Sequence, residues 1–363
     1  MKELGLEIIN KIIANGYDAY IVGGFVRDSL LNIKSTDVDI TTSAPPKVIK
    51  KIFPSSEIKS DSYGAMVINY KNYRFDITTM REEMEYLDNR HPSSIKYVND
   101  LKKDLLRRDF TVNALCFNKD GELIDLIGGK NDLDKKIIRT IIPSEKSFQD
   151  DALRILRAIR FASFLGFSMS DEIKEAIKNN KHLLNKLSTS RKKEELDKIF
   201  GSKKAHEGIK LIEELQLEKE LHLDNLDRVK DYSDIIGIWA MINSNYYSFT
   251  NNEKELIKKI NITYEMDNLD NCVLYYYGCY VNVLAGINKG IKKKDILYHY
   301  ENLPIKRRDE IKISAKEMCD ILKREPASFI GKLYSKIEKA ILSGKLENDN
   351  DKIKEFIKRS QDE

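Results

Sequence analysis

The sequence has few cysteines and histidines, and neither type is arranged as a metal site. The four cysteines, Cys116, Cys272, Cys279 and Cys319, lack the paired spacing of zinc ligands. They are typical of reduced thiols in a cytosolic protein. The five histidines are scattered, without a histidine–aspartate pair or an HxxxH spacing. The sequence therefore does not support a histidine-based metal hydrolase.

Long apolar runs and a strong charge of one sign are also missing. No run of 18 apolar residues could span a membrane, and the amino terminus lacks the apolar region of a signal peptide. Lys and Arg total 62 against 58 Asp and Glu, so the net charge is only +4. A nucleic-acid partner would need a local basic surface. We expect a cytoplasmic protein without a membrane partner, and 363 residues are enough for two or three domains.

The densest set of chemical signals lies between Tyr20 and Thr42. Tyr20-Ile21-Val22 is typical of a short buried strand, and Gly23-Gly24 permits a tight turn whose backbone N–H groups can face an anion. A helix over 25–31 then carries Arg27 in its first turn, where it could meet a phosphate. A plain glycine turn is the alternative for this pair alone, but the order strand, turn, helix, strand favours a phosphate site.

Three aspartates follow on two predicted strands. In Asp37-Val38-Asp39 the period of two places both carboxylates on one face, and close carboxylates favour a divalent cation. Mg²⁺ prefers one or two carboxylates together with substrate phosphates, which indicates a nucleoside-triphosphate site with two-metal chemistry. Asp76 lies on the second strand of a hairpin over 65–70 and 73–78 and is a candidate third carboxylate. A solvated strand edge is the alternative for each.

Two later stretches add arginines. Arg107 and Arg108 precede an aspartate in KKDLLRRDFTVNA, and an arginine pair can clamp triphosphate oxygens. A single helix is predicted from Phe148 to Phe164, with Asp151, Arg154, Arg157 and Arg160 spaced three apart. On such a helix the first three stay within about 120° of one another, and the fourth lies opposite the first. An aspartate beside an arginine could read the edge of a base; a surface salt bridge is the alternative.

The remaining chain divides into a loop and a long helical part. We expect a mobile surface loop over 80–94, and no strands beyond Pro143. Helices are predicted from Asp171 onward, including an aromatic-rich core helix over 272–280. Two basic clusters, at 291–294 and 306–308, could contact the backbone of an RNA or lie solvated on the surface.

With these motifs in view, the chain resembles the class II branch of the tRNA nucleotidyltransferase (CCA-adding enzyme) and bacterial poly(A) polymerase superfamily. The resemblance covers about residues 18–201. It rests on linked motifs in the expected order: GGFVRD (23–28), DVD (37–39), RRDFTVNA (107–114), LIGG (126–129) and DDALRILRAIRF (150–161).

The resemblance implies a role for each candidate residue. Asp37 and Asp39 would hold catalytic Mg²⁺, Gly24 and Arg27 would meet the phosphates, and Arg108 the triphosphate or sugar. Asp151 and Arg154 would serve as a protein template for cytosine or adenine, with Arg157 and Arg160 holding the nucleotide. The implied reaction is attack of an RNA 3′-hydroxyl on the α-phosphate of CTP or ATP with release of pyrophosphate.

Some positions depart from the family pattern or separate its branches. Asp150-Asp151 replaces the usual Glu-Asp, and Ser190-Arg191 replaces Glu-Arg. Tyr86, Asp88, Arg90 and Pro92 fit the Y-x-D-x-R-x-P loop pattern, which favours an enzyme able to add the terminal A. Poly(A) polymerases usually carry Lys-Asp-Phe-Asp at the metal pair, where this chain has Thr36-Asp37-Val38-Asp39.

We therefore expect an α+β protein that adds CCA to tRNA, with Mg²⁺ as cofactor, tRNA, ATP and CTP as partners, and no obligate protein partner. An enzyme that adds only A or only CC is the second hypothesis, and a poly(A) polymerase is the third. A non-catalytic RNA-binding module is the rival from another class. The expected parts are a catalytic head with a small mixed sheet (1–140), a helical neck with the template (141–201), a helical body (202–290) and a tRNA-binding tail (291–363).

Overall fold

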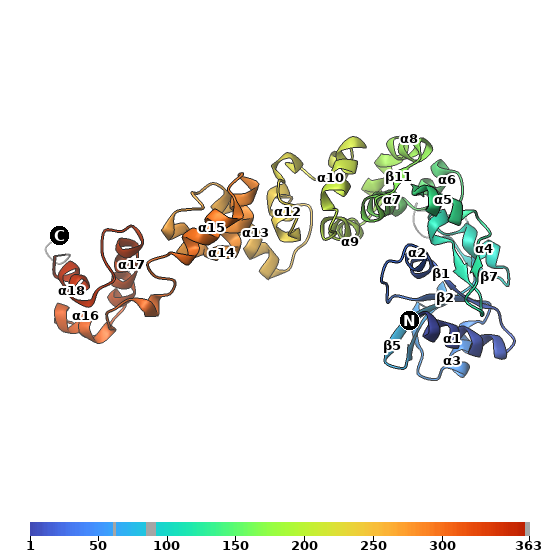
Figure 1. Cartoon of the computed structure of the whole chain (residues 1–363), viewed down its shortest axis with the longest axis horizontal. Coiled ribbons are helices and arrows are strands. Elements are labelled where there is room, and N and C mark those ends of the chain that lie inside the picture. The colour runs from blue at the N-terminus through green and yellow to red at the C-terminus, as the bar shows by residue number, and fades with distance from the viewer. Residues whose placement is uncertain (61–62, 85–91, 360–363) are drawn as a thin grey trace. The chain divides into compact units, whose positions relative to one another are not determined.

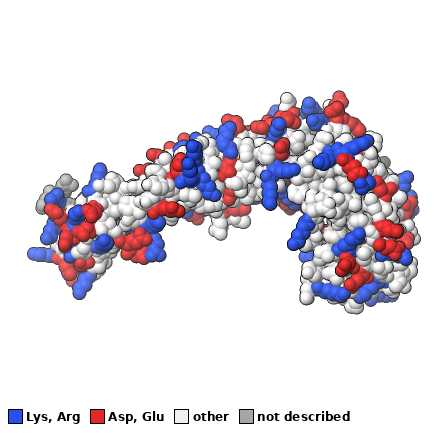
Figure 2. Space-filling view, viewed as in Figure 1, with Lys and Arg blue, Asp and Glu red and all other residues white. Residues whose placement is uncertain are grey.

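The chain forms two compact units, Met1–His222 and Leu223–Glu363, each with its own core. The computed structural model describes residues 1–60, 63–84 and 92–359 (Figure 1). Lys and Arg side chains are interspersed with Asp and Glu on the visible face of both units, in keeping with the small net charge (Figure 2). Among the described residues, none of the helices is long and apolar enough to cross a membrane.

The first unit is built on a mixed seven-stranded sheet in the order β3-β4-β5-β2-β1-β8-β9. Neighbouring strands are antiparallel except β2 and β5, which run parallel and place Asp39 opposite Asp76. The α+β class with a mixed sheet in the head is thereby confirmed. The strands are β1 (Ala19–Val22), β2 (Asp39–Thr42), β3 (Glu57–Ser60), β4 (Ala65–Tyr70), β5 (Tyr73–Thr79), β8 (Cys116–Phe117) and β9 (Leu123–Ile124).

Helices cover the sheet because their apolar stripes match its buried positions. Ile8, Ile9 and Ile12 of α1 (Lys2–Ala14) are fully buried, and α1 packs on β1 and against α3 (Pro46–Ile52), as Figure 1 shows. A Cβ atom at Gly5 would lie only 2.8 Å from Cδ1 of Ile21 and 3.3 Å from Cγ1 of Val38, so a larger residue there would require these side chains to shift.

The predicted hairpin over 65–78 is present, and its turn explains its register. Lys71 and Asn72 both have positive φ, the conformation of a two-residue turn that matches the twist of paired strands. The predicted loop over 80–94 is wrong in part, because β6 (Arg81–Glu83) and β7 (Ile95–Tyr97) pair as a small antiparallel sheet. Residues 85–91, with Tyr86, Asp88 and Arg90 of the loop pattern, lie outside the described residues.

The segment after this small sheet leads to the helical part of the first unit. It contains α4 (Leu101–Leu106), the 3₁₀ turn η2 (Thr111–Asn113), α5 (Gly129–Lys135) and the parallel pair β10 (Ile137–Ile138) and β11 (Ser168–Met169). Strand β11 corrects the expectation that no strand follows Pro143. The remaining helices are α6 (Ser144–Asp150), α7 (Leu153–Leu165), α8 (Asp171–Asn180), α9 (Thr189–Phe200), α10 (Ala205–Glu214) and α11 (Glu218–Leu221).

The helix predicted over 148–164 is in fact two helices that meet at Asp151. Asp151 has extended backbone angles, φ −139° and ψ 102°. Its Oδ1 accepts a hydrogen bond from the backbone N of Leu153, the first residue of α7, at 3.0 Å, and Ala152 between them is the N-cap. The rotation argument that separated Asp151 from Arg160 was therefore wrong, because Asp151 does not lie on the same helix.

The second unit is helical and packs around a core of Leu, Ile and Val side chains. Its longest helix, α14 (Asn271–Asn288), is kinked at Gly278, where φ is 79°. Tyr276 and Tyr280 near the kink are about half exposed, so the prediction of a wholly buried aromatic helix was wrong. The other helices are α12 (Ile235–Ile242), α13 (Asn251–Tyr264), α15 (Lys293–Glu301), α16 (Ala315–Leu322), α17 (Phe329–Leu342) and α18 (Asn350–Arg359).

Candidate active site

A polar cleft of about 940 Å³ opens in the first unit beside the start of α2 (Gly24–Leu30) and α7. Of the ten candidate site residues, nine line this cleft and Asp76 does not. The nine are Gly24, Arg27, Asp37, Asp39, Arg108, Asp151, Arg154, Arg157 and Arg160. The fold thus brings residues from 24 to 160 of the sequence to one place.

The Gly23 turn joins β1 to α2 at the floor of the cleft. Gly23 has φ 86° and ψ −139°, angles that a residue with a side chain rarely adopts. A Cβ atom here would lie 3.6 Å from Oδ2 of Asp39 and 3.7 Å from Nη1 of Arg108. The bare turn therefore allows a carboxylate and a guanidinium to approach the same point of the backbone.

Asp37 and Asp39 flank the start of β2. Val38 between them is fully buried, whereas Asp37 is exposed and precedes the strand rather than lying on it. Burial raises the pKa of Asp39 to about 6, and the nearby carboxylates of Asp37 and Asp76 act in the same direction against Arg108. Carboxylates that oppose one another's ionisation are suited to a divalent cation, which would favour their charged forms.

Asp76 lies on β5 in register with Asp39. Its Oδ2 forms an ion pair with Lys59, and its Oδ1 is buried without a hydrogen-bond partner among the described residues. In residues 1–60, 63–84 and 92–359, no group of three or more His, Cys, Asp and Glu side chains forms a ready metal site. The donors present are hard oxygens, and two carboxylates plus substrate phosphates suit Mg²⁺.

The raised pKa of Asp39 predicts a pH effect on stability in the metal-free protein. A carboxyl that holds its proton more tightly when folded contributes stability at low pH, and that contribution is lost as the pH rises from about 4 through 6. We expect Asp39→Asn to gain stability relative to wild type over this range, on the order of 2 kcal/mol. Urea unfolding in EDTA at pH 4 to 7 measures it. If the free energy of unfolding changed with pH in the same way for the two proteins, the raised pKa of Asp39 would be contradicted. Added Mg²⁺ should narrow the difference in stability between wild type and Asp39→Asn.

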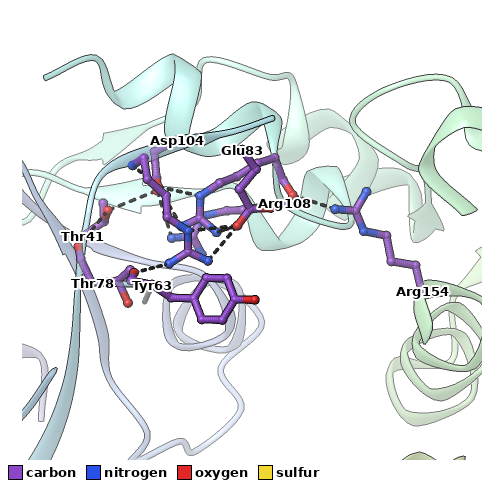
Figure 3. Close-up of polar contacts among 9 residues, drawn as sticks. Thr41, Tyr63, Thr78, Glu83, Asp104, Arg108 and Arg154 are labelled. Atoms are coloured by element: carbon purple, nitrogen blue, oxygen red, sulfur yellow. Dashed lines mark hydrogen bonds and ion pairs between the residues drawn. The ribbon is translucent and has the colours of Figure 1, made fainter. Parts of the chain in front are cut away.

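Arg107 and Arg108 end α4 and share one acceptor, the fully buried Asp104 (Figure 3). Arg107 Nη2 lies 2.7 Å from Asp104 Oδ1 and Arg108 Nη2 3.3 Å from Oδ2. Arg107 also pairs with Glu83 at 3.3 Å. The Nη1 atom of Arg108 would lie 3.7 Å from a Cβ atom at Gly23, so this end of the guanidinium is the one beside the turn. The Nε atom of Arg108 is buried without a hydrogen-bond partner in the part of the chain that the structure describes.

Arg27 is buried at the base of α2 and is held by two neighbours. Its Nε and Nη2 donate to Oδ1 of Asp28, and its Nη1 donates to Oδ1 of Asn113 at 2.5 Å. Asn113 in turn donates to Asp109 at 3.1 Å. The bonds to Asp28 and Asn113 occupy three of the N–H groups of Arg27. A phosphate contact by its remaining N–H groups is still a prediction.

Asp109 links this network to α7. It accepts hydrogen bonds from Nε and Nη2 of Arg157 at 2.8 and 2.5 Å. Burial alone would raise the pKa of Asp109, but the Arg157 guanidinium and the hydrogen bond from Asn113 outweigh burial and lower it to about 2. A continuous chain of hydrogen bonds thus runs from Arg27 through Asn113 and Asp109 to Arg157.

Arg154 lies one helical turn before Arg157 and is 6% exposed. Its Nη1 donates to Oγ of Ser147 at 2.9 Å, and its Nη2 donates to the backbone oxygen of Arg107 at 2.7 Å. Figure 3 shows the Arg154 side chain extending toward the group that includes Arg108 and Glu83. Two of its five N–H groups are engaged in these bonds, and the rigid fork is thereby fixed at the edge of the cleft.

The aromatic ring of Phe161, which also lines the cleft, contacts three arginine side chains. The guanidinium carbons of Arg27, Arg157 and Arg160 lie 5.1, 5.4 and 4.4 Å from its ring centroid. Arg160 also pairs with Glu195 of α9 at 2.8 Å, so Glu195 braces α7 as well as Lys198 of its own helix. The guanidinium groups of arginines favour contact with aromatic faces, and such contacts hold the side chains in an extended conformation.

Sequence reasoning missed four residues that organise these arginines: Asp104, Asp109, Asn113 and Phe161. Asp109 and Asn113 stand in the RRDFTVNA stretch and Phe161 in the helix motif, yet none was singled out. The only signal was their position within those motifs. Asp109 acts on Arg157, 48 positions away, whereas Asp104 pairs with Arg107 and Arg108 of its own segment.

Comparisons with known proteins agree along the whole chain. Residues 19–139 match the "Poly A polymerase head domain" family, and residues 166–224 match the family described as "Probable RNA and SrmB-binding site of polymerase A". Residues 247–357 match the family of domain 2 of tRNA nucleotidyltransferases.

Individual relatives cover nearly the full length. The chain is 30% identical to the CCA-adding enzyme of Bacillus subtilis over 97% of each protein, and 31% identical to that of Ligilactobacillus salivarius over 99% of this chain and 96% of the relative. It is similar to the crystal structure of the Bacillus stearothermophilus CCA-adding enzyme in complex with CTP, with TM-score 0.82, 26% identity and coverage of 99% and 97%. The Thermotoga maritima enzyme complexed with tRNA shares the fold, with TM-score 0.74, 24% identity and coverage of 99% and 95%.

Proposed function

Because this chain belongs to the class II CCA-adding enzymes of the tRNA nucleotidyltransferase and poly(A) polymerase family, we propose that its cleft performs both the chemistry and the choice of base. The chain adds CCA to the 3′ end of tRNA from CTP and ATP, without a nucleic-acid template. The observation that supports the assignment of the site is the meeting of Asp37 and Asp39 with Arg108 and Arg154 in one cleft.

One wall carries the chemistry. Asp37 and Asp39 would hold Mg²⁺, which when bound neutralises phosphate charge and activates the attacking hydroxyl. The bare Gly23 turn lets the triphosphate approach the backbone, and Gly24 opens α2 beside it. Arg108, whose Nη1 atom lies beside that turn, would contact the phosphates or the sugar. With the triphosphate held in this way, the RNA 3′-hydroxyl attacks the α-phosphate in line and pyrophosphate leaves. A direct part for Asp76 remains a prediction.

The other wall would choose the base. Asp151 offers carboxylate acceptors and Arg154 offers N–H donors at the same edge of the cleft, the combination needed to pair with the Watson–Crick edge of cytosine or adenine. Asp151 is held by a hydrogen bond from the backbone N of Leu153, and Arg154 by Ser147 and the Arg107 backbone. Arg157 and Arg160 would hold the nucleotide from the same helix. Fixed groups of this kind discriminate better than mobile ones because little order must be imposed on binding.

The rest of the chain would hold tRNA. We keep the proposed head (1–140), neck (141–201), body (202–290) and tail (291–363) as functional parts. In the second unit, a pocket of about 540 Å³ is lined by Arg324, Lys332 and Lys336 around Phe329. No carboxylate lines it among the described residues. Such a cationic surface suits an RNA backbone, recognised by shape and charge rather than sequence.

Removing the three cations of this pocket should weaken tRNA binding without changing nucleotide binding. For Arg324→Ala/Lys332→Ala/Lys336→Ala we expect the slope of log K against log salt to fall by about 3 and the KM for tRNA to rise about tenfold. Filter binding over a salt series measures the slope. Lys312→Ala/Lys316→Ala/Lys345→Ala, three exposed lysines of the same unit, is the control. Equal effects of the two triple variants on the salt slope and on the KM for tRNA would contradict a role of this pocket in tRNA binding.

Incubation of the purified chain with tRNA lacking CCA tests the proposed function. We expect two C additions with CTP alone, CCA with both nucleotides, and loss of all extension in EDTA that Mg²⁺ restores. Extension in EDTA would contradict the metal assignment, and a long A tail would move the conclusion to poly(A) polymerase. A cytoplasmic location remains a prediction, motivated by four free cysteines.

A further inference from the structure

A buried carboxylate joins the two walls of the cleft. Asp104 on α4 is fully buried and accepts from two side chains of its own segment, Arg107 and Arg108. It also accepts from the backbone N of Arg81 at 3.2 Å and from Oγ1 of Thr41 at 3.1 Å. The carboxylate therefore fastens α4 to both β2 and β6. Figure 3 shows Asp104 beside Thr41 and Arg108.

On the wall of the cleft that carries the chemistry, Asp104 is linked toward the proposed metal-binding aspartates through Thr41 and through Arg108. Thr41 stands two residues after Asp39 on β2, so the Thr41 hydroxyl ties Asp104 to the strand that begins with Asp39. Arg108 lies between Asp104 and the Gly23 turn. With Nη2 of the guanidinium held by Asp104, Nη1 is the end that lies beside the Gly23 turn, where it can donate to a ligand in the cleft.

On the base-reading wall, Asp104 acts through Arg107. Both Asp104 and Glu83 hold the Arg107 side chain, and the backbone oxygen of Arg107 accepts the 2.7 Å hydrogen bond from Arg154. The position of that oxygen fixes the Arg154 fork. A shift of α4 would therefore move the phosphate contact and the base contact together.

The charged side chains around Asp104 favour a fixed arrangement of the arginines and leave a positive charge that can attract an anion. The Arg81, Arg107 and Arg108 side chains surround the carboxylates of Glu83 and Asp104, which leaves an excess of one positive charge. Burial alone would raise the pKa of Asp104, but Arg107 and Arg108 outweigh it and lower the pKa. The carboxylate thus stays charged, and charged hydrogen bonds orient their donors more strongly than neutral ones.

We propose that Asp104 is a positioning residue that sets Arg108 for the triphosphate and, through the Arg107 backbone, Arg154 for the base. The inference rests on the proposed function. It goes further by naming a residue outside the cleft on which both rate and base choice depend. Loss of its charge should therefore alter selectivity as well as rate, which a residue that only stabilises the fold would not do.

The test compares Asp104→Asn with Asp132→Asn. Asp132 is also a buried aspartate of the first unit, paired with Arg139 at 2.8 Å and bonded to Thr111, but it does not touch the cleft. For Asp104→Asn we expect kcat/KM to fall about 100-fold for both nucleotides, since small misplacements cost this much. We expect the ratio of CTP to ATP use at the final position to change about tenfold. Asp132→Asn should keep the wild-type ratio.

The selectivity ratio is taken within one preparation, so it does not depend on the fraction of folded protein. Thr41→Val, which removes one neutral contact to Asp104, should move the ratio in the same direction by a smaller factor. A wild-type ratio in Asp104→Asn would overturn the inference while leaving the proposed function intact. Failure of the wild-type chain to extend tRNA would instead overturn the proposed function and the inference together.

Discussion

Replacing Asp39 by asparagine should abolish addition of both C and A while tRNA binding persists. Asp39 starts β2 at the floor of the cleft beside the Gly23 turn and Arg108. Asparagine keeps the shape but removes the negative charge, so the site would hold a divalent cation poorly. Because the metal and the phosphate clamp supply most transition-state stabilisation in phosphoryl transfer, we expect a loss on the order of 10³-fold or more in kcat.

Single-turnover extension with saturating enzyme measures this loss without interference from tRNA release. Asp37→Asn should behave in the same way if both carboxylates hold metal. Asp120→Asn, an exposed aspartate on the turn between β8 and β9, is the matched control and should retain wild-type turnover. Turnover within about tenfold of wild type in either Asp37→Asn or Asp39→Asn would reject the metal assignment.

The second large effect concerns base choice at Arg154. Arg154→Lys keeps a positive charge but loses the planar fork, which a lysine cannot reproduce. Its two tethers, to Ser147 and to the Arg107 backbone, would also be lost or displaced. A well-placed bidentate contact gives about 1–3 kcal/mol of discrimination, so the preference for the correct nucleotide should fall about 10- to 100-fold.

Competition between CTP and ATP at each added position measures this preference. The KM for tRNA should stay near the wild-type value, because Arg154 is buried and its proposed contact is with the nucleotide. Arg139→Ala, which removes an arginine paired with Asp132 outside the cleft, should leave the preference unchanged. A uniform loss for both nucleotides in Arg154→Lys, with the preference intact, would count against a role in reading the base.

The sequence predicted those parts of the fold that depend on neighbours along the chain. The strands over 65–70 and 73–78 alternate apolar and polar residues and meet at a two-residue turn, so local pattern and local turn chemistry agree. Asp151 shows where this reasoning failed. Its helical surroundings favoured one long helix, whereas its backbone is extended and its side chain bonds the backbone N of Leu153, so the helix is broken at that point.

The candidate site was predicted as a set of residues but not as an arrangement. Metal carboxylates and arginines could be picked out because their chemistry is specific. The partners that aim the arginines could not, because a buried ion pair such as Asp109 with Arg157 joins segments 48 residues apart. Asp104 looked like one charge among many in a polar helix, although it is fully buried and holds two arginines.

The central claim is that a single cleft in this chain adds two C residues and one A and then stops. The most direct test is sequencing of the 3′ ends after an exhaustive reaction of the chain with tRNA lacking CCA, CTP, ATP and Mg²⁺. We predict products that end in CCA, and no detectable extension by Asp39→Asn within the time that the wild-type chain needs to complete the reaction. Ends in CC alone, a run of A residues, or CCA ends produced by Asp39→Asn would contradict the account.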